Sequence, residues 1–252
     1  MVPVFLEIFS GSGRLAQAFG RAQELVLTWD ILFGPAYDLT KASSMHLILG
    51  WIRAGMIRGI YLGTPCTSFS RIRGVGAGPP ALRSDSEPMG LASLTREADL
   101  SAVRSGNSLL RVSCQIFNMC IKCEVPCSLE NPATSRLWMA PSIGFLLRRV
   151  AVHRSTTEFC MWGRPWRKST SFMHYLVDLS VLEERRCLGC KRGFCKRTGR
   201  PHIQLMGRGP DGRFWTKIAE PYPRSLCDEI VRKFSDAVCA QRASRFSVLM
   251  GM

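Results

Sequence analysis

The sequence predicts an α/β protein built on a doubly wound, mostly parallel sheet. Residues 3–9 are almost all apolar and lead directly into a glycine turn at residues 11–13, which is typical of a strand buried on both faces of a parallel sheet. Strand and helix patterns then alternate as far as residue 63. Such alternation predicts parallel strands with helices packed on both sides.

The elements of the first half follow one another closely. Helical spacing of apolar residues and short apolar runs predict, in order, helix 14–22, strand 25–29, helix 43–56 and strand 57–63. The second strand ends at Asp30 and the third delivers Pro65 and Cys66 at its carboxyl end. Ligands of open parallel sheets bind at these carboxyl ends, so both positions are candidates for a site.

The second half is less regular. Glycines and prolines interrupt residues 71–100, which predicts a long loop. The elements expected after it are helix 100–122, strand 124–129, helix 141–149, strands 152–159 and 170–173, and a final helix 224–242. The predicted organisation is a core of residues 1–180, a basic Cys/Gly-rich insert of residues 181–215, and a C-terminal helical segment of residues 216–252.

The charge favours a polyanionic partner. The 252 residues include 34 Lys and Arg against 19 Asp and Glu, a net charge of +15, and 46% are hydrophobic, enough for a substantial core. Sixteen basic and five acidic residues lie between positions 148 and 217. Nucleic acid is the expected partner; a charge that serves only solubility is the alternative.

The cysteine content and the hydropathy indicate in which kind of cellular compartment the protein is expected. Eleven cysteines cannot all pair internally, and neither a secretory signal nor an apolar run of membrane-spanning length is evident. We therefore expect no membrane association and a reducing intracellular location, the nucleus if the source is eukaryotic. There Cys66 remains a thiol.

Three motifs occur in a fixed order along the chain. The glycine turn at residues 9–13 (FSGSG) comes first, residues 63–70 (GTPCTSFS) follow, and residues 127–132 (CSLENP) come last. A glycine turn, then Pro-Cys, then Glu-Asn resembles the cytosine-C5 DNA methyltransferases. The resemblance implies a class I, Rossmann-like methyltransferase fold, S-adenosylmethionine as cofactor, and methyl transfer to C5 of a cytosine flipped out of its stack. DNA is the favoured substrate and RNA remains open.

The first motif is the candidate cofactor site. Glycines at 11 and 13 permit a tight turn and a close approach to a ligand, and an acidic residue about 20 positions on can hold ribose hydroxyls. The resemblance implies a cofactor shell of Phe9, Gly11, Gly13, Asp30, Asp38 and Pro65. NAD is the rival cofactor, but Ala16 stands at the last position of the G-x-G-x-x-G pattern, which is a weaker match.

Cys66 is the candidate nucleophile. Cytosine C5 becomes nucleophilic when a thiolate adds to C6, and thiolates are favoured by nearby cations. Arg71 and Arg73 are close in sequence, so we expect them to assist Cys66 and to contact nucleic acid. Thr67 stands where the family has Gln, and Pro-Cys alone is also compatible with a buried structural cysteine.

Glu130 is the candidate proton-handling carboxylate. A carboxyl group beside cytosine N3 can donate or share a proton, and a dry pocket would raise its pKa. The family has Glu-Asn-Val where this chain has Pro132. The tripeptide alone fits a surface Glu at a strand end, but with Cys66 sixty-four residues upstream we favour the catalytic pairing.

The stretch 160–169 (CMWGRPWRKS) loosely resembles the family's Gly-x-Pro-Gln-x-Arg-x-Arg motif, with Trp166 in place of Gln. Tryptophans at 162 and 166 alternate with cations, which suits base stacking and phosphate neutralisation. A solvated turn is the alternative. The cations predicted to bind nucleic acid here are Arg164, Arg167 and Lys168.

The insert contains a candidate zinc site. Cys187-x-x-Cys190, followed by Cys195 and His202, provides the ligand types of tetrahedral zinc. A metal would stabilise an insert that has few apolar residues; unliganded cysteines in a basic loop are the alternative.

Two departures from the family favour a second hypothesis. The large target-recognition region is reduced to about residues 187–213, and Tyr222-Pro223 stands where the family has Gly-Asn. A catalytically inactive, nucleic-acid-binding remnant of a mobile-element methyltransferase is therefore the alternative function.

Overall fold

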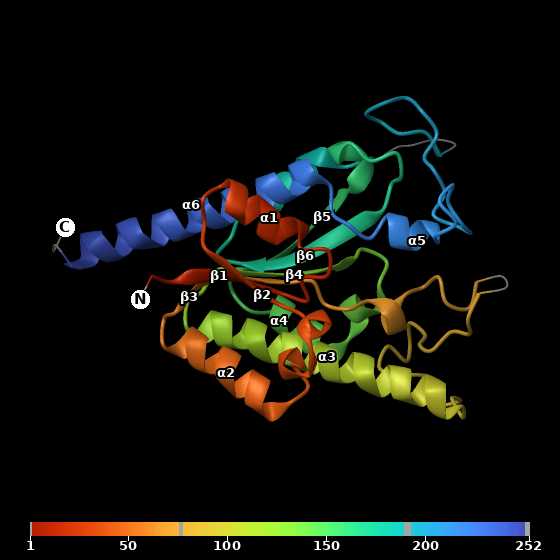
Figure 1. Cartoon of the computed structure of the whole chain (residues 1–252), viewed down its shortest axis with the longest axis horizontal. Coiled ribbons are helices and arrows are strands. Elements are labelled where there is room, and N and C mark those ends of the chain that lie inside the picture. The colour runs from red at the N-terminus through yellow and green to blue at the C-terminus, as the bar shows by residue number, and fades with distance from the viewer. Residues whose placement is uncertain (1, 76–77, 189–192, 250–252) are drawn as a thin grey trace.

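The centre of the fold is a six-stranded sheet with the strand order β2-β1-β3-β4-β6-β5 (Figure 1). The computed structural model describes the backbone of residues 2–75, 78–188 and 193–249, and the side chains as far as residue 244. The strands are β1 (Val4–Ile8), β2 (Val26–Trp29), β3 (Ile57–Leu62), β4 (Cys127–Pro132), β5 (Val152–Glu158) and β6 (Ser169–Tyr175).

The strand directions confirm a doubly wound, mostly parallel sheet. β1 pairs in parallel with both β2 and β3, and β3 pairs in parallel with β4. β6 is antiparallel to both β4 and β5, so β5 runs in the same direction as β4. The chain leaves β1 on one side for β2 and returns on the other side for β3, and this reversal is where Rossmann-like sheets bind ligands.

Helices cover both faces of the sheet (Figure 1). One layer contains α1 (Arg14–Arg21) and α6 (Arg224–Leu249), which pack against each other. The other contains α2 (Ala42–Arg53), α3 (Glu97–Lys122) and α4 (Pro141–Leu147). The short α5 (Trp215–Ile218) accompanies the basic insert. The 3-10 turns are η1 (Ile31–Phe33), η2 (Pro35–Tyr37), η3 (Thr67–Phe69), η4 (Arg136–Met139), η5 (Phe159–Trp162) and η6 (Ser180–Arg185).

The two helical layers enclose two apolar clusters. The α2/α3/α4 side is mostly aliphatic, with Ile60 and Ile116 fully buried, and also contains Phe117. On the other side Phe5 of β1 stacks on Phe19 of α1 with ring centroids 4.5 Å apart, and Phe234 of α6 meets Phe5 edge-on at 6.0 Å. The C-terminal helix thus packs as part of the core layer.

The expected order of elements is confirmed, with shifted ends. α3 begins at Glu97, where Glu97 and Asp99 lie in the first turn and favour the helix dipole, and α6 continues to Leu249. Within the described parts of residues 71–96 there is neither strand nor α-helix, as predicted for a long loop. None of the helices in the described ranges is long and apolar enough to span a bilayer.

Candidate active site at the carboxyl ends of the strands

The glycine turn after β1 is built from left-handed residues. Gly11 has φ 49°, Gly13 has φ 64°, and Phe9 adopts φ 58° although it carries a side chain. The left-handed conformation costs an L-residue about 1 kcal/mol or more, which explains the glycines. Phe9 is held there by the strand pairing, since its N–H donates to the carbonyl of Trp29 at 2.8 Å.

Asp30 fastens this turn to the end of β2. Its Oδ2 accepts the N–H of Gly11 at 2.8 Å and its Oδ1 accepts the N–H of Leu32 at 2.9 Å. Asp30 is buried, so both oxygens order the backbone beside the turn. Binding of ribose hydroxyls by this carboxylate stays a prediction.

Glu7 is a second buried carboxylate at the turn, and the sequence analysis did not single it out. Its Oε2 accepts the N–H of Ala16, in the first turn of α1, at 2.8 Å. Burial raises the pKa of Glu7 to about 7, with a smaller contribution from the charge of Asp30, while the hydrogen bond from Ala16 opposes the rise. The sequence does contain a sign of this residue, because Glu7 is an acidic residue inside an otherwise apolar strand.

Asp38 lies farther along the same edge. Its Oδ1 accepts both the N–H and the hydroxyl of Thr40, at 2.9 and 2.7 Å, and these bonds lower the pKa of Asp38. The side chains of Ile31 and Leu32, which precede it, are largely exposed. This edge therefore offers a carboxylate next to an apolar surface.

The loop that carries Cys66 lies directly beside the glycine turn. A Cβ on Gly63 would stand 3.0 Å from the carbonyl oxygen of Phe9, so a glycine is needed where β3 ends. The next residue, Thr64, is buried, and its carbonyl accepts the amide of Asn131 at 2.7 Å. This bond links the Cys66 loop to the end of β4.

Arg83 fixes the other side of the Cys66 loop. It is 1% exposed, and its guanidinium carbon lies 3.8 Å from the centroid of the Phe69 ring in η3. Desolvation lowers the pKa of Arg83 to about 10. The acceptors for its five N–H donors are Ser68 O and Oγ, Pro88 O, Asn107 Oδ1 and Val103 O, at 2.8–3.3 Å.

Gly106 of α3 makes room for this arrangement. A Cβ there would lie 2.1 Å from the hydroxyl oxygen of Ser68 and 2.9 Å from the Arg83 guanidinium. Arg83 of the long loop, Ser68 of η3 and Gly106 of α3 therefore pack together next to the loop that carries Cys66.

Glu130 is buried at the end of β4 and both of its oxygens are engaged. Oε2 accepts the hydroxyl of Tyr222 at 2.8 Å, and Oε1 accepts the hydroxyl of Thr170 in β6. The sequence analysis noted Tyr222 only as standing in place of a family motif. The structure makes it a partner of the predicted catalytic carboxylate.

Lys168 completes the site. Its Nζ donates to the carbonyls of Ala219 and Glu220 at 3.1 and 3.3 Å, and lies 4.7 Å from the centroid of the Phe159 ring. Burial lowers the pKa of Lys168, while the charges of Glu130 and Cys66 act to raise it. The sequence analysis placed Lys168 among the phosphate contacts; the structure puts it within electrostatic reach of Cys66 and Glu130.

The protonation of Cys66 follows from this environment. Burial, and then the nearby charge of Glu130, raise the pKa of the Cys66 thiol above its ordinary value, while the charge of Lys168 lowers it. Glu130 and Lys168 thus act on the Cys66 thiol in opposite directions, and the three residues are called here the Cys66 group.

Arg71 and Arg73 are engaged by groups other than Cys66, and their assistance to the thiolate and contact with nucleic acid stay predictions. Arg71 pairs with Asp85 at 2.7 Å and donates to the carbonyl of Thr134 at 2.8 Å. Arg73 donates to the carbonyl of Pro80 at 3.1 Å and lies 3.9 Å from Asp99. Their charges are directed to carboxylates, and the cation that acts on the thiol is Lys168.

The expectation that Trp162 and Trp166 stack on bases is wrong, because both are 6% exposed and belong to the apolar cluster on the α6 side. Of the neighbouring cations, Arg164 is partly accessible and Arg167 is exposed. The Arg167 side chain is 48% exposed and 3.8 Å from Glu158. Arg164 lines an open pocket with Arg14 and Arg224, so its phosphate binding stays a prediction.

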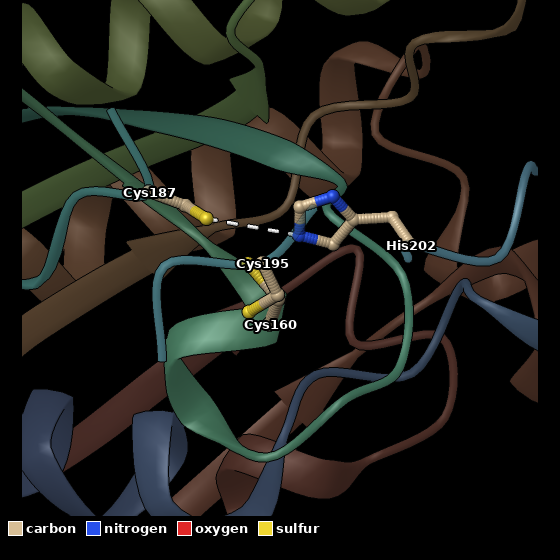
Figure 2. A group of neighbouring side chains, drawn as sticks. All are labelled: Cys160, Cys187, Cys195 and His202. Carbon is tan, nitrogen blue, oxygen red and sulfur yellow. Dashed lines mark hydrogen bonds between the residues drawn. The ribbon is translucent and has the colours of Figure 1, made fainter. Parts of the chain in front are cut away.

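Three of the four predicted metal ligands come together: Cys187, Cys195 and His202. The fourth, Cys190, lies outside the described residues. A cysteine that the sequence analysis did not assign to the metal, Cys160, stands beside the other three (Figure 2).

Comparison with known proteins gives similarity to solved structures alone. No protein-family model and no curated protein matches the chain. A structure described as a prophage-encoded DNA modification methyltransferase of E. coli is 14% identical, with a TM-score of 0.39, over 69% of this chain and 46% of that one. The S. pombe Dnmt2 methyltransferase is 12% identical, with a TM-score of 0.38, over 69% and 49% of the two chains.

The Entamoeba histolytica methyltransferase EhMeth is 10% identical, with a TM-score of 0.37, over 69% of this chain and 52% of that one. The chain thus spans about half the length of these structures. Its doubly wound sheet is established by its own strand order and pairing.

Proposed function

We propose that the chain is an S-adenosylmethionine-dependent methyltransferase that modifies C5 of cytosine in nucleic acid, with DNA as the favoured substrate. The observation that carries the proposal is the placement of Cys66 and Glu130 at the carboxyl ends of the adjacent strands β3 and β4, close enough for the charge of Glu130 to act on the Cys66 thiol. The glycine turn lies directly beside them, across Gly63.

The Cys66 group supplies the chemistry expected of these residues. The Cys66 thiolate adds to C6 of a flipped cytosine, forming a sulfur–carbon bond and moving electron density to C5. Glu130, oriented by Tyr222 and Thr170, holds a proton at N3 of the base. Lys168 favours the thiolate, because its ammonium charge opposes the effect of burial.

The glycine turn fits a bound cofactor. A Cβ at Gly13 would meet no atom within 4 Å, so there is open space at the turn. The carboxylates of Asp30 and Asp38 and the exposed apolar side chains after β2 border the same edge. The residues that would hold S-adenosylmethionine are Phe9, Gly11, Gly13, Asp30, Asp38 and Pro65. When bound, this cofactor supplies the methyl group.

A trapping assay tests the proposal. The full chain is incubated with S-adenosylmethionine and DNA that contains 5-fluorocytosine, then with the equivalent RNA, and a denaturation-resistant complex is sought. We expect the adduct with the parent and with the control Cys239→Ser, which alters an exposed cysteine. Cys66→Ser should form none.

The result also separates the two candidate functions. An adduct on DNA, RNA or both identifies the substrate. No adduct on either, together with no cofactor binding by calorimetry, would overturn the enzyme and favour the inactive nucleic-acid-binding remnant.

A further inference from the structure

A buried cluster of sulfur and nitrogen atoms lies beneath the basic insert. Cys160, Cys187, Cys195 and His202 each present one ligand atom, and these four atoms all lie within 4.8 Å of one another (Figure 2). All four residues are buried. They come from separate segments: Cys160 lies in η5, and the other three lie in the insert, Cys187 just after η6 and Cys195 and His202 farther along.

The donor set and its dimensions suit zinc. Three thiols and one imidazole form a Cys₃His set, and with Zn–S of about 2.3 Å and Zn–N of about 2.0 Å the ligand atoms of a tetrahedron lie roughly 3.5–3.8 Å apart. The Sγ of Cys187 and the Nε2 of His202 are already 3.7 Å apart. The remaining separations need only a small contraction around an ion.

Hydrogen bonds from the surrounding chain orient the residues of the cluster. The N–H of Lys196 points at the Sγ of Cys187 from 3.3 Å. The N–H of Cys187 donates to the buried carboxylate of Glu158 at 2.7 Å, and Arg197 donates to the carbonyl of Cys160 at 2.8 Å. Hydrogen bonds of this kind orient the ligands of structural metal sites.

Apolar packing does not explain the cluster. Among the described residues, the hydrophobic cluster at this place consists of the three cysteines Cys160, Cys187 and Cys195, with Met161 packed against them. Leu182, Leu205 and Trp215 of the insert pack into the apolar cluster on the α6 side. Around the four ligands themselves, so small a core is a weak basis for order, whereas a bound metal contributes folding free energy directly.

We propose that Cys160, Cys187, Cys195 and His202 bind one structural zinc ion. Binding forms three Zn–S bonds and one Zn–N bond, and the three thiol protons pass to the buffer. Four protein ligands leave no open position, so the site is structural. Cys160, from the turn after β5, takes the place that sequence spacing suggested for Cys190.

The position of Cys160 gives the zinc a role in the architecture. β5 runs parallel to β4, and its last residue, Glu158, pairs with Ser169, the neighbour of Lys168. A zinc ion bound by Cys160 therefore links the insert to the end of the sheet at which the Cys66 group lies.

Metal analysis of the purified full chain tests the site. We expect one zinc per chain by elemental analysis. In the parent, the cobalt-substituted form should show the spectrum of a tetrahedral site with three thiolates. Cys160→Ser should lose the metal, whereas Cys190→Ser and Cys239→Ser should retain it. Cys160→His keeps a ligand at the position, so it should retain one metal with a two-thiolate cobalt spectrum, even if Cys160→Ser fails to fold.

Three results would overturn the proposal: no metal in a parent purified with zinc present, a disulfide among these cysteines in its place, or loss of zinc from Cys190→Ser with retention by Cys160→Ser. The readout is independent of catalysis. A parent that contains zinc but forms no fluorocytosine adduct would leave the zinc site standing and remove the proposed function.

Discussion

The hydroxyl of Tyr222 donates a hydrogen bond to Oε2 of Glu130 at 2.8 Å, across 92 positions of sequence. The segment that leads into α6 thereby contacts the predicted catalytic carboxylate at the end of β4. The same hydroxyl lies 3.6 Å from where a Cβ on Gly63 would stand. The hydrogen bond thus lies beside the carboxyl ends of both β3 and β4.

Replacing Tyr222 by Phe should impair adduct formation more than folding. The change removes one hydrogen bond to a charged group, which contributes about 1.5–3 kcal/mol, and leaves Glu130 held by Thr170 alone. We expect the rate of adduct formation to fall about tenfold or more. The control is Tyr175→Phe, at the opposite end of β6. Equal rates for both variants would contradict the orienting role of Tyr222.

Gly106→Ala should disturb the Cys66 loop from behind. The added methyl group would lie 2.1 Å from the hydroxyl oxygen of Ser68, so η3 or α3 must move, at a cost of about 1–3 kcal/mol. Urea unfolding and the trapping assay measure the two effects. In the control Gly50→Ala, in α2, the Cβ meets no atom within 4 Å, and we expect stabilisation by up to about 1 kcal/mol. An unaffected Gly106→Ala would show that the loop is not held as described.

Glu7 should make stability decline as pH rises. Its pKa is about 7 in the folded chain against 4.5 for the ordinary group, so between these values the folded state binds more protons than the unfolded state, and the free energy of unfolding falls with increasing pH. The full decline is about 3 kcal/mol, present above pH 7 and absent below pH 4.5.

Glu7→Gln should remove this part of the slope, as measured by urea unfolding from pH 5 to 8. Asp38→Asn is the control, because the pKa of Asp38 is lowered and this carboxyl group therefore titrates below that range. A slope in Glu7→Gln identical to that of the parent would contradict the assignment.

Lys168 and Glu130 should shift the reactivity of Cys66 in opposite directions. Because Lys168 lowers and Glu130 raises the pKa of the thiol, Lys168→Met should slow its alkylation by iodoacetamide at pH 8 severalfold and Glu130→Gln should accelerate it. Mass spectrometry of the Cys66 peptide gives the rates, with the exposed Cys239 as internal reference.

Lys122→Met is the matched control, since that exposed side chain lies in the last turn of α3 and is not among the groups that act on Cys66. Identical alkylation rates in the Lys168, Glu130 and parent chains would show that the three groups do not form one electrostatic unit.

The features predicted from the sequence were those encoded locally. The glycine turn, the Pro-Cys turn and the Glu-Asn strand end each follow from a few adjacent residues, and parallel strands bring their carboxyl ends together. Cys66 and Glu130 could therefore be expected at the same end of the sheet from the sequence alone.

The features that were missed depend on contacts far apart in sequence. Tyr222 and Lys168 reach the site because β6 inserts antiparallel beside β4 and the segment before α6 passes over the strand ends. Cys160 joins the metal ligands through the turn after β5, outside the spacing that suggested the cluster. Arg71 and Arg73 are near Cys66 in sequence, but Asp85 and Asp99 attract their side chains elsewhere.

The packing of α6 on β1 has a consequence for synthesis of the protein. Phe5 and Phe19 are synthesised before their partner Phe234, which lies more than 200 residues later in the chain. Domains generally fold as units during synthesis, so until α6 arrives Phe5 is covered only by Phe19 of α1 and not by Phe234. Tyr222 precedes α6 directly, so Glu130 gains that hydrogen bond only then. A chain that stops before this segment therefore lacks the bond and leaves part of the aromatic cluster exposed.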